Sequence, residues 1–177
     1  MPIIGCWEHL RVDGMKPKIV IVDENNNIIG HKERETLKRE DIYRVSALWL
    51  TNGKGDILLA RRALTKSHDP GKWGPAVAGT VEEGETYHSN IVKETAEELG
   101  LKDIKPEKGP MIRISSRHNY FCQWYILTID KPITQFKIQK AEVEEIKWFS
   151  KGELAEQLDK KPEEFLKRMK RYLGAFK

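Results

Sequence analysis

Three glutamates, Glu94, Glu97 and Glu98, lie close together in one segment of the 177-residue chain. At about 100° per residue in a helix, their side chains fall within one arc and would form a carboxylate face. The opposite arc would carry the residues that anchor the helix to a core: Val92, Thr95, Ala96 and Leu99. Grouped carboxylates suit a hard divalent cation such as Mg²⁺, which commonly shares its ligands with substrate phosphates. The alternative is a glutamate face that is simply exposed to solvent. The surrounding sequence distinguishes between a metal site and such a face.

Those surrounding residues follow a longer pattern. Gly79 is followed by Glu85, and the run Lys93-Glu94-Thr95-Ala96-Glu97-Glu98-Leu99-Gly100-Leu101 completes it. The pattern resembles the Nudix box, G-x5-E-x7-R-E-U-x-E-E-x-G-U, where U is a bulky aliphatic residue. Lys93 replaces the arginine of the box, and Thr95 replaces its first aliphatic residue. Because a lysine lacks the planar fork of an arginine, we expect looser orientation of the carboxylates.

The resemblance implies a fold, a metal and a reaction. The fold would be α/β (α+β), a Nudix-like α/β/α sandwich with a mixed β-sheet and an N-terminal β-hairpin extension. Glu94, Glu97 and Glu98 would hold Mg²⁺ or Mn²⁺, with the Gly79 carbonyl as a further ligand, and Glu85 would support the loop-helix geometry. The reaction would be metal-dependent hydrolysis of a diphosphate bond, which needs charge neutralisation and a positioned water.

Hydrolysis also needs a general base, which Nudix enzymes often recruit from the helix or from a loop outside the box. The candidates are Glu94 and the acidic stretch 142–145, from which we take Glu144 as a catalytic residue. For any single acid of that stretch, a solvated entry to the strand at 146–149 is the alternative.

Some of the basic residues lie in segments that carry a second resemblance. Segments 61–66 and 70–73 resemble isopentenyl diphosphate isomerases, a branch of the same superfamily. That likeness implies that Arg62 and Lys66, together with Arg34, grip a diphosphate. Since side chains alternate along a strand, only one of Arg61 and Arg62 can face the site.

The isomerase chemistry itself is missing from the sequence. The isomerase cysteine would fall at Ala78 and one of its metal-binding histidines at Thr80. Further metal-site and acidic positions would fall near residues of other types: Lys38, Tyr43, Arg117 and Asn119. Because an alanine cannot shuttle a proton, we expect a hydrolase and keep the isomerase as the less favoured alternative. A non-catalytic nucleotide-binding module is the other alternative, although the intact set of three glutamates argues against it.

Hydrophobic patterning predicts the elements that position these residues. Turn residues between β-branched runs predict a hairpin at about 18–34 and a second hairpin around the Asn52-Gly53 turn. Further strands are expected at 76–81, 112–114, 121–129 and 146–149, and a helix from about Glu85 to Gly100. C-terminal helices are expected over about 151–173, at 151–158 and 162–173. Adjacent Trp124 and Tyr125 alternate across a sheet, so one of them is expected to line the pocket.

Composition bounds the class of protein. With 39% hydrophobic and 33% charged residues, the chain suits one globular domain spanning 1–177. The charge of +4 is compatible with a small anionic substrate, and we expect no nucleic-acid polymer as partner. Two cysteines without paired spacing, no apparent signal peptide and no long apolar run favour the cytoplasm. The diphosphate compound itself stays open among nucleotides, nucleotide sugars and prenyl diphosphates, and the N-terminal hairpin could serve a homodimer.

Overall fold

The computed structural model describes residues 17–176, and expectations for residues 1–16, including Cys6, lie outside this range. A nine-stranded mixed sheet is the centre of the structure. Its strands are β1 (Lys18–Val22), β2 (Ile28–Glu33), β3 (Ile42–Thr51), β4 (Ile57–Arg62), β5 (Trp73–Pro75), β6 (Val77–Thr80), β7 (Glu107–Ser115), β8 (Asn119–Thr128) and β9 (Val143–Phe149). The helices are α1 (Tyr87–Leu99), α2 (Lys151–Lys160) and α3 (Met169–Ala175), with 3-10 turns η1 (Arg34–Thr36), η2 (Ile133–Gln135) and η3 (Pro162–Glu164).

Strand β3 organises the sheet. It pairs in parallel with β8 along nearly its whole length, from Tyr43↔Tyr120 to Thr51↔Thr128. Its other edge meets β1, β6 and β4 in turn, all antiparallel, and β9 and β5 continue the sheet from β4. The sheet is therefore mixed, as the sequence predicted.

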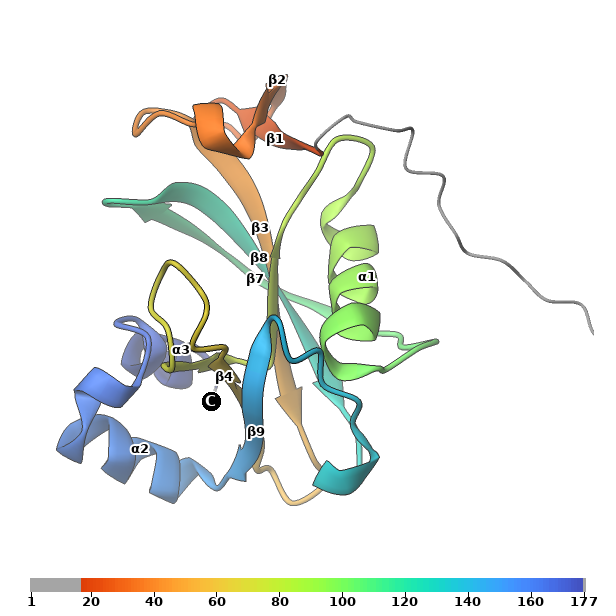
Figure 1. Cartoon of the computed structure of the whole chain (residues 1–177), viewed down its shortest axis with the longest axis vertical. Coiled ribbons are helices and arrows are strands. Elements are labelled where there is room, and N and C mark those ends of the chain that lie inside the picture. The colour runs from red at the N-terminus through yellow and green to blue at the C-terminus, as the bar shows by residue number, and fades with distance from the viewer. Residues whose placement is uncertain (1–16, 177) are drawn as a thin grey trace, which may run out of the picture.

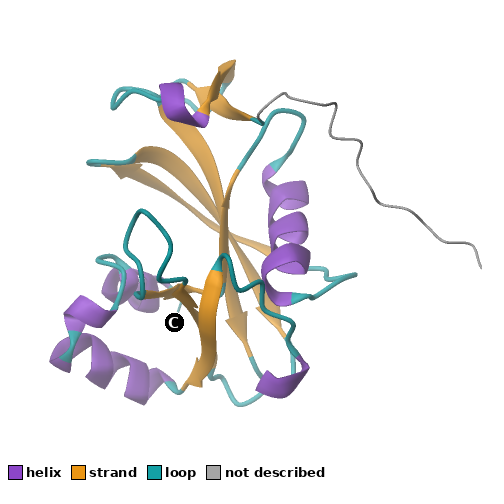
Figure 2. Cartoon of the chain, viewed as in Figure 1, coloured by secondary structure: helices purple, strands orange, loops and turns teal. Residues whose placement is uncertain are grey.

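Helices cover both faces of this sheet (Figures 1 and 2). Leu48 and Leu50 of β3 pack in the same cluster as Ile91 and Leu99 of α1. The alternate residues Ala47 and Trp49 pack in a second cluster, which includes residues of α2 and α3. Because side chains alternate along a strand, one strand supplies the core on both faces. The result is the expected sandwich of α1, the sheet, and the pair α2 and α3.

The N-terminal hairpin is present as expected. β1 and β2 pair antiparallel from Lys18↔Glu33 onward, and β1 joins the main sheet through Ile21↔Tyr43 and Val22↔Ile42. The turn between them is stabilised by the Asp23 carboxylate, which accepts hydrogen bonds from the backbone N–H groups of Asn25 and Asn27 at 2.8 and 2.9 Å. The hairpin thus extends the sheet beside the start of β3.

Two expectations about the chain were wrong. The helix expected over 162–173 is interrupted, because η3 ends at Glu164 and α3 begins only at Met169. Between them Phe165 forms a parallel bridge with Trp73, and Leu166 N–H donates to the Trp73 carbonyl at 2.8 Å. Phe165 is 2% exposed, so burial of its ring and pairing with the short strand β5 outweigh local helix formation.

Neither Trp124 nor Tyr125 lines an open pocket, contrary to expectation. Trp124 is 1% exposed and packs edge-on against Tyr172 of α3, at 4.6 Å between ring centroids. Tyr125 is 5% exposed and contacts His88 on the α1 face. β8 is covered on both faces at this point, which the sequence alternation could not reveal.

No helix within residues 17–176 is both long enough and apolar enough to cross a membrane.

Candidate functional site: a carboxylate helix at the edge of β6

The ends of helix α1 are fixed by local sequence. Thr86 caps its start, because the side-chain oxygen accepts a hydrogen bond from Ser89 N–H at 3.0 Å and Ser89 Oγ accepts one from Thr86 N–H. Gly100 ends it in the left-handed conformation at φ 68°, which a glycine adopts without strain. The helix is therefore held in one register relative to β6, which precedes it.

Lys93 of α1 forms ion pairs with three nearby glutamates. Its Nζ lies 2.6 Å from Glu85 Oε1, 3.4 Å from Glu82 Oε2 and 3.5 Å from Glu94 Oε1. Burial lowers the pKa of Lys93, but the hydrogen bond to Glu85 and the charges of these acids outweigh it and raise the pKa overall. A single ammonium group thus ties the loop before α1 to the helix, so the lysine fulfils an anchoring role without the planar fork of an arginine.

Asn90, which sequence reasoning missed, joins the helix to the sheet. It is fully buried, and its Nδ2 donates to the Thr80 carbonyl at 3.1 Å and to Glu85 Oε2 at 2.8 Å. Its Oδ1 accepts a short hydrogen bond from Ser46 Oγ on β3. The only signal in the sequence was a polar residue beside Ile91, in the segment expected to supply the helix anchor. Because every polar atom of Asn90 has a partner, its burial is compatible with a stable core.

Gly79 is a glycine because Glu94 lies against it. A Cβ atom on Gly79 would come within 2.4 Å of Glu94 Cγ and 2.7 Å of its Cδ. The Glu94 side chain therefore crosses the edge of β6 directly above the Gly79 backbone. This contact explains in physical terms why the first residue of the motif and its helical glutamate occur together.

The three motif glutamates do not lie together on the face opposite the buried stripe, contrary to expectation. The buried stripe of α1 is Ile91, Thr95 and Leu99, and Val92 and Ala96 are only partly buried. Glu94 and Glu98 border this stripe and are partly buried, whereas Glu97 is exposed. Asn90 is also fully buried, so the face of α1 that packs on the sheet is centred away from Val92, where the sequence had placed it. Thr95 fits the aliphatic position since its hydroxyl donates to the Ile91 carbonyl at 2.6 Å.

Glu98 lies where the charges of two further segments converge. Burial raises the pKa of its carboxyl group to about 8, and the charges of Glu94 and Glu142 add to the increase. Lys66 and Arg62 act in the opposite direction. Lys66 Nζ also lies 2.5 Å from Glu142 Oε2. The predicted residues Glu94, Arg62 and Lys66, together with Glu142, thus all act electrostatically on Glu98. We call these five residues the carboxylate site.

Glu144 lies just outside this group. In the pairing of β4 with β9, Arg61 is opposite Glu145 and Arg62 is opposite Val143, so Glu144 is the extra residue of a bulge. Its backbone carbonyl accepts a hydrogen bond from Lys140 Nζ at 2.8 Å. Within the acidic stretch 142–145, the charge of Glu142 ranks among the largest causes of the raised pKa of Glu98.

The predicted cations separate into two locations. Arg62 Nε donates to the His68 carbonyl at 3.0 Å, whereas Arg61 is held by the Gly71 carbonyl at 2.9 Å and by Glu145 at 3.7 Å. Arg34 lies elsewhere, at the end of β6, where its Nη1 donates to Thr80 Oγ1 at 3.4 Å. Arg62 thus belongs to the carboxylate site, and Arg34 marks a second, neighbouring position.

The carboxylate site fits a divalent cation by its chemistry. Burial raises the pKa of Glu94 and the charge of Glu97 adds to the increase, although the ammonium group of Lys93 acts in the opposite direction. Buried carboxylates crowded by other carboxylates gain from a divalent cation, which would stabilise their charged forms. Within residues 17–176 no three acidic, histidine or cysteine side chains already converge as a cage. Mg²⁺ commonly binds through one or two carboxylates together with substrate phosphates, so two partly buried glutamates suffice.

A family model described as the NUDIX domain matches residues 42–169. The chain belongs to this family. The Nudix domain match begins at the first residue of β3, so it leaves out the β1–β2 hairpin.

Individual relatives agree with this assignment. The chain is 29% identical over 160 residues to an uncharacterized Nudix hydrolase of Yersinia pestis, covering 86% of this chain and 84% of the relative. It is also 29% identical over 154 residues to an isopentenyl-diphosphate Delta-isomerase of Streptomyces griseus, covering 80% and 75% of the two chains. Among solved structures, the protein DR0079 of Deinococcus radiodurans superposes with a TM-score of 0.76 at 22% identity, over 90% of this chain and 99% of that one. The structural likeness confirms the expected fold class.

Proposed function

We propose that this Nudix domain hydrolyses a diphosphate bond in a nucleotide or another nucleoside-diphosphate-linked compound, with Mg²⁺ or Mn²⁺ at the carboxylate site. One observation carries the proposal. Two partly buried glutamates, Glu94 and Glu98, share a site with the cations Arg62 and Lys66. Carboxylates for a metal beside cations for phosphate oxygens make up the set of groups that diphosphate hydrolysis requires.

Each group has a role in the proposal. Glu94 and Glu98 hold the cation, with the Gly79 carbonyl and the exposed Glu97 as further ligands. A bound cation would neutralise phosphate oxygens and lower the pKa of a water molecule. Arg62 and Lys66 bind the diphosphate oxygens and orient the scissile bond.

We assign the general base to Glu142, with Glu144 as the second candidate. In the free protein Glu142 is neutralised by Lys66, at 2.5 Å. When Lys66 binds a phosphate oxygen instead, the Glu142 carboxylate is released to accept a proton from water. The ion pair therefore couples substrate binding to activation of the base.

Isomerase activity is the second candidate, because isopentenyl-diphosphate isomerases are among the relatives. The geometry disfavours it. Ala78 is exposed on β6 and offers no thiol at the position that the resemblance assigns to the isomerase cysteine. Cys122, the cysteine within the described residues, is 3% exposed, and burial raises the pKa of its thiol to about 12. A thiol so placed cannot exchange protons with a substrate.

The test is a panel of nucleoside triphosphates, nucleotide sugars and prenyl diphosphates, assayed with Mg²⁺ or Mn²⁺ for released phosphate, pyrophosphate or nucleoside monophosphate. We expect metal-dependent release that Glu98→Gln and Glu97→Gln reduce strongly. Glu142→Gln should lower kcat by about 100-fold or more, the usual contribution of a general base, whereas Glu144→Gln should have a small effect. The reverse order of these two variants would return the role to Glu144.

Two outcomes would contradict the proposal. Double-bond isomerisation of a prenyl diphosphate without hydrolysis would establish the isomerase. Binding of panel compounds without turnover would establish a nucleotide-binding module. The expectations of a cytoplasmic protein and of a homodimer formed through the β1–β2 hairpin are proposals of the same kind and rest on the sequence.

A further inference from the structure

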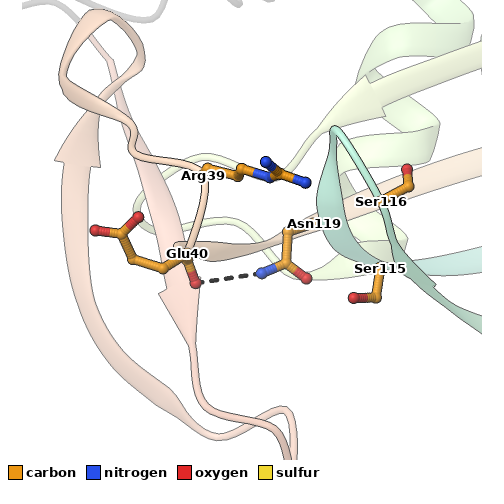
Figure 3. A pocket seen from close by; sticks show the side chains of 5 residues that line it. All are labelled: Arg39, Glu40, Ser115, Ser116 and Asn119. Atoms are coloured by element: carbon orange, nitrogen blue, oxygen red, sulfur yellow. Dashed lines mark hydrogen bonds between the residues drawn. The ribbon is translucent and has the colours of Figure 1, made fainter.

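A pocket of about 440 Å³ lies apart from the carboxylate site, between the loop that enters β3 and the tip of the β7–β8 hairpin. It is lined by Arg39, Glu40, Ser115, Ser116 and Asn119. Figure 3 shows Arg39 and Asn119 reaching into the space between the two segments, with both serines on the hairpin side. The volume falls in the range of small-molecule sites, so the pocket can accept more than a single ion.

The surroundings of this pocket are strongly positive. Arg168, which precedes α3, donates from Nη2 to Ser116 Oγ at 2.6 Å. Burial lowers the pKa of His118 at the hairpin tip, and the charges of His68, Arg117 and Arg168 lower it further. The Glu40 carboxylate points away from Arg39 and Asn119 (Figure 3), and no ion pair links an acid to Arg39 in the described part of the chain. The pocket therefore offers a cation and the Ser115 hydroxyl to an anion, and the Ser116 hydroxyl becomes a further donor if it gives up its long hydrogen bond of 3.4 Å to the His118 carbonyl.

Asn119 contributes one side-chain oxygen that has no hydrogen-bond partner among the described residues. Its Nδ2 donates to the Glu40 carbonyl at 3.2 Å, which fixes the orientation of the amide. Its Oδ1 is buried and accepts no hydrogen bond from any described residue. A buried acceptor without a donor costs roughly 1–3 kcal/mol, so a ligand hydroxyl at this position would be favoured.

Strand β3 runs from the pocket toward the end of β6. Thr80, which binds Arg34 through its hydroxyl and Asn90 through its carbonyl, is opposite Val45 on β3. Tyr43 lies two residues earlier, about 7 Å along the strand, and stacks on Tyr120 of β8 at 5.4 Å. The charges of Arg34 and Arg168 both act on Tyr43. One extended compound could therefore reach from the edge of β6 to the pocket.

We propose that this pocket binds a phosphate monoester carried on a hydroxylated carbon skeleton, as in a sugar phosphate. Arg39 and the hydroxyl groups of Ser115 and Ser116 bind the phosphate, and Asn119 Oδ1 accepts from an adjacent hydroxyl. This inference rests on the proposed hydrolase function: the natural substrate then carries a phosphate ester in addition to the diphosphate that is cleaved. The pocket thereby selects among diphosphate compounds.

Binding can be tested without metal and without turnover. Ribose 5-phosphate, inorganic phosphate and ribose are titrated into the protein in EDTA, and backbone amide shifts are followed by NMR. We expect shifts at Ser115, Ser116 and Asn119, with affinity in the order ribose 5-phosphate, phosphate, ribose. Arg39→Gln should weaken ribose 5-phosphate by about 10-fold or more, the effect of one charge-assisted hydrogen bond. Lys54→Gln is the matched control, because it removes one charge at the exposed turn beyond the opposite end of β3.

The pocket assignment would be overturned if ribose 5-phosphate caused no amide shift, or shifts at Arg62 and Lys66 alone. Equal affinities of Arg39→Gln and Lys54→Gln for ribose 5-phosphate would also overturn it. A separate arm compares turnover of matched pairs, dephospho-coenzyme A with coenzyme A and ADP-ribose with its 2′-phosphate. Preference for a phosphorylated member that Arg39→Gln abolishes supports the substrate class, and equal kcat/KM in both pairs refutes it. If neither pair turns over in the wild type, the substrate class is refuted. The hydrolase proposal is then judged on the wider panel described above, and the metal-free titration still decides the pocket.

Discussion

The contact between Gly79 and Glu94 gives a sharp quantitative test of the site geometry. A Cβ atom on residue 79 would lie 2.4 Å from Glu94 Cγ, well inside van der Waals contact. Glu94 Cγ is not the free end of its side chain, so the helix or the strand has to shift. We expect Gly79→Ala to lower the free energy of unfolding by about 1–3 kcal/mol, the usual cost of overpacking.

The sign of this effect should reverse when Glu94 is shortened. A Glu94→Ala background removes the three atoms nearest to the added Cβ, and the Gly79 backbone is not in the left-handed region. Gly79→Ala should then stabilise the protein by about 0.4–1 kcal/mol, because alanine restricts the unfolded chain. The coupling free energy in the double-mutant cycle is therefore about 1.5–4 kcal/mol.

Urea unfolding of the four proteins without added metal measures this cycle. Gly30→Ala is the control, since Gly30 lies in β2 with nothing within 4 Å of the added Cβ atom. It should have little effect on stability or stabilise slightly in both backgrounds. If Gly79→Ala has the same effect with and without the Glu94 side chain, the two residues do not touch and the proposed position of the metal ligand is wrong.

Two further predictions concern charge in the site. Burial and the charges of Glu94 and Glu142 raise the pKa of Glu98 to about 8, so between about pH 4.5 and 8 the native metal-free protein keeps a proton that the unfolded chain has released. The free energy of unfolding should therefore fall as pH rises through this window. Glu98→Gln should remove this pH dependence and raise the free energy of unfolding at pH 8 by about 2–5 kcal/mol. Urea unfolding at pH 5 and pH 8 measures both effects, and an unchanged pH dependence in the variant would contradict the assignment. Lys93→Met should cost about 1–3 kcal/mol because Glu85 and Glu94 lose their shared cation, and Lys93→Arg should recover most of it, whereas equal unfolding midpoints for the two variants would show that the ion pairs contribute nothing.

Much of the frame follows from local sequence. The hairpin turns, the Thr86 cap and the Gly100 terminus are decided by contacts between residues a few positions apart. The same holds for the grouping of glutamates on one helix, since their spacing fixes their angular positions. These features could be predicted because local conformation and periodicity determine them.

Tertiary packing decided which of those residues share the site. Asn90 is buried together with Ile91, Thr95 and Leu99, so Glu94 and Glu98 border the core and Glu97 does not. The charge of Glu142, which comes just before β9, acts on Glu98, whereas Glu144 is the extra residue of a bulge in that strand. No local rule predicts such pairs, because their separation depends on how distant loops and strands pack.

The pocket at Arg39 also depends on tertiary packing rather than on local sequence. Arg39 and the two serines lie far apart in the sequence, in segments that no motif marks. The loop that enters β3 and the hairpin tip that carry them meet only in the folded sheet. The sequence by itself determined the family chemistry, because the Nudix box is a local pattern. The tertiary structure alone decided the second pocket, because its groups come together only when β3 and β8 pair.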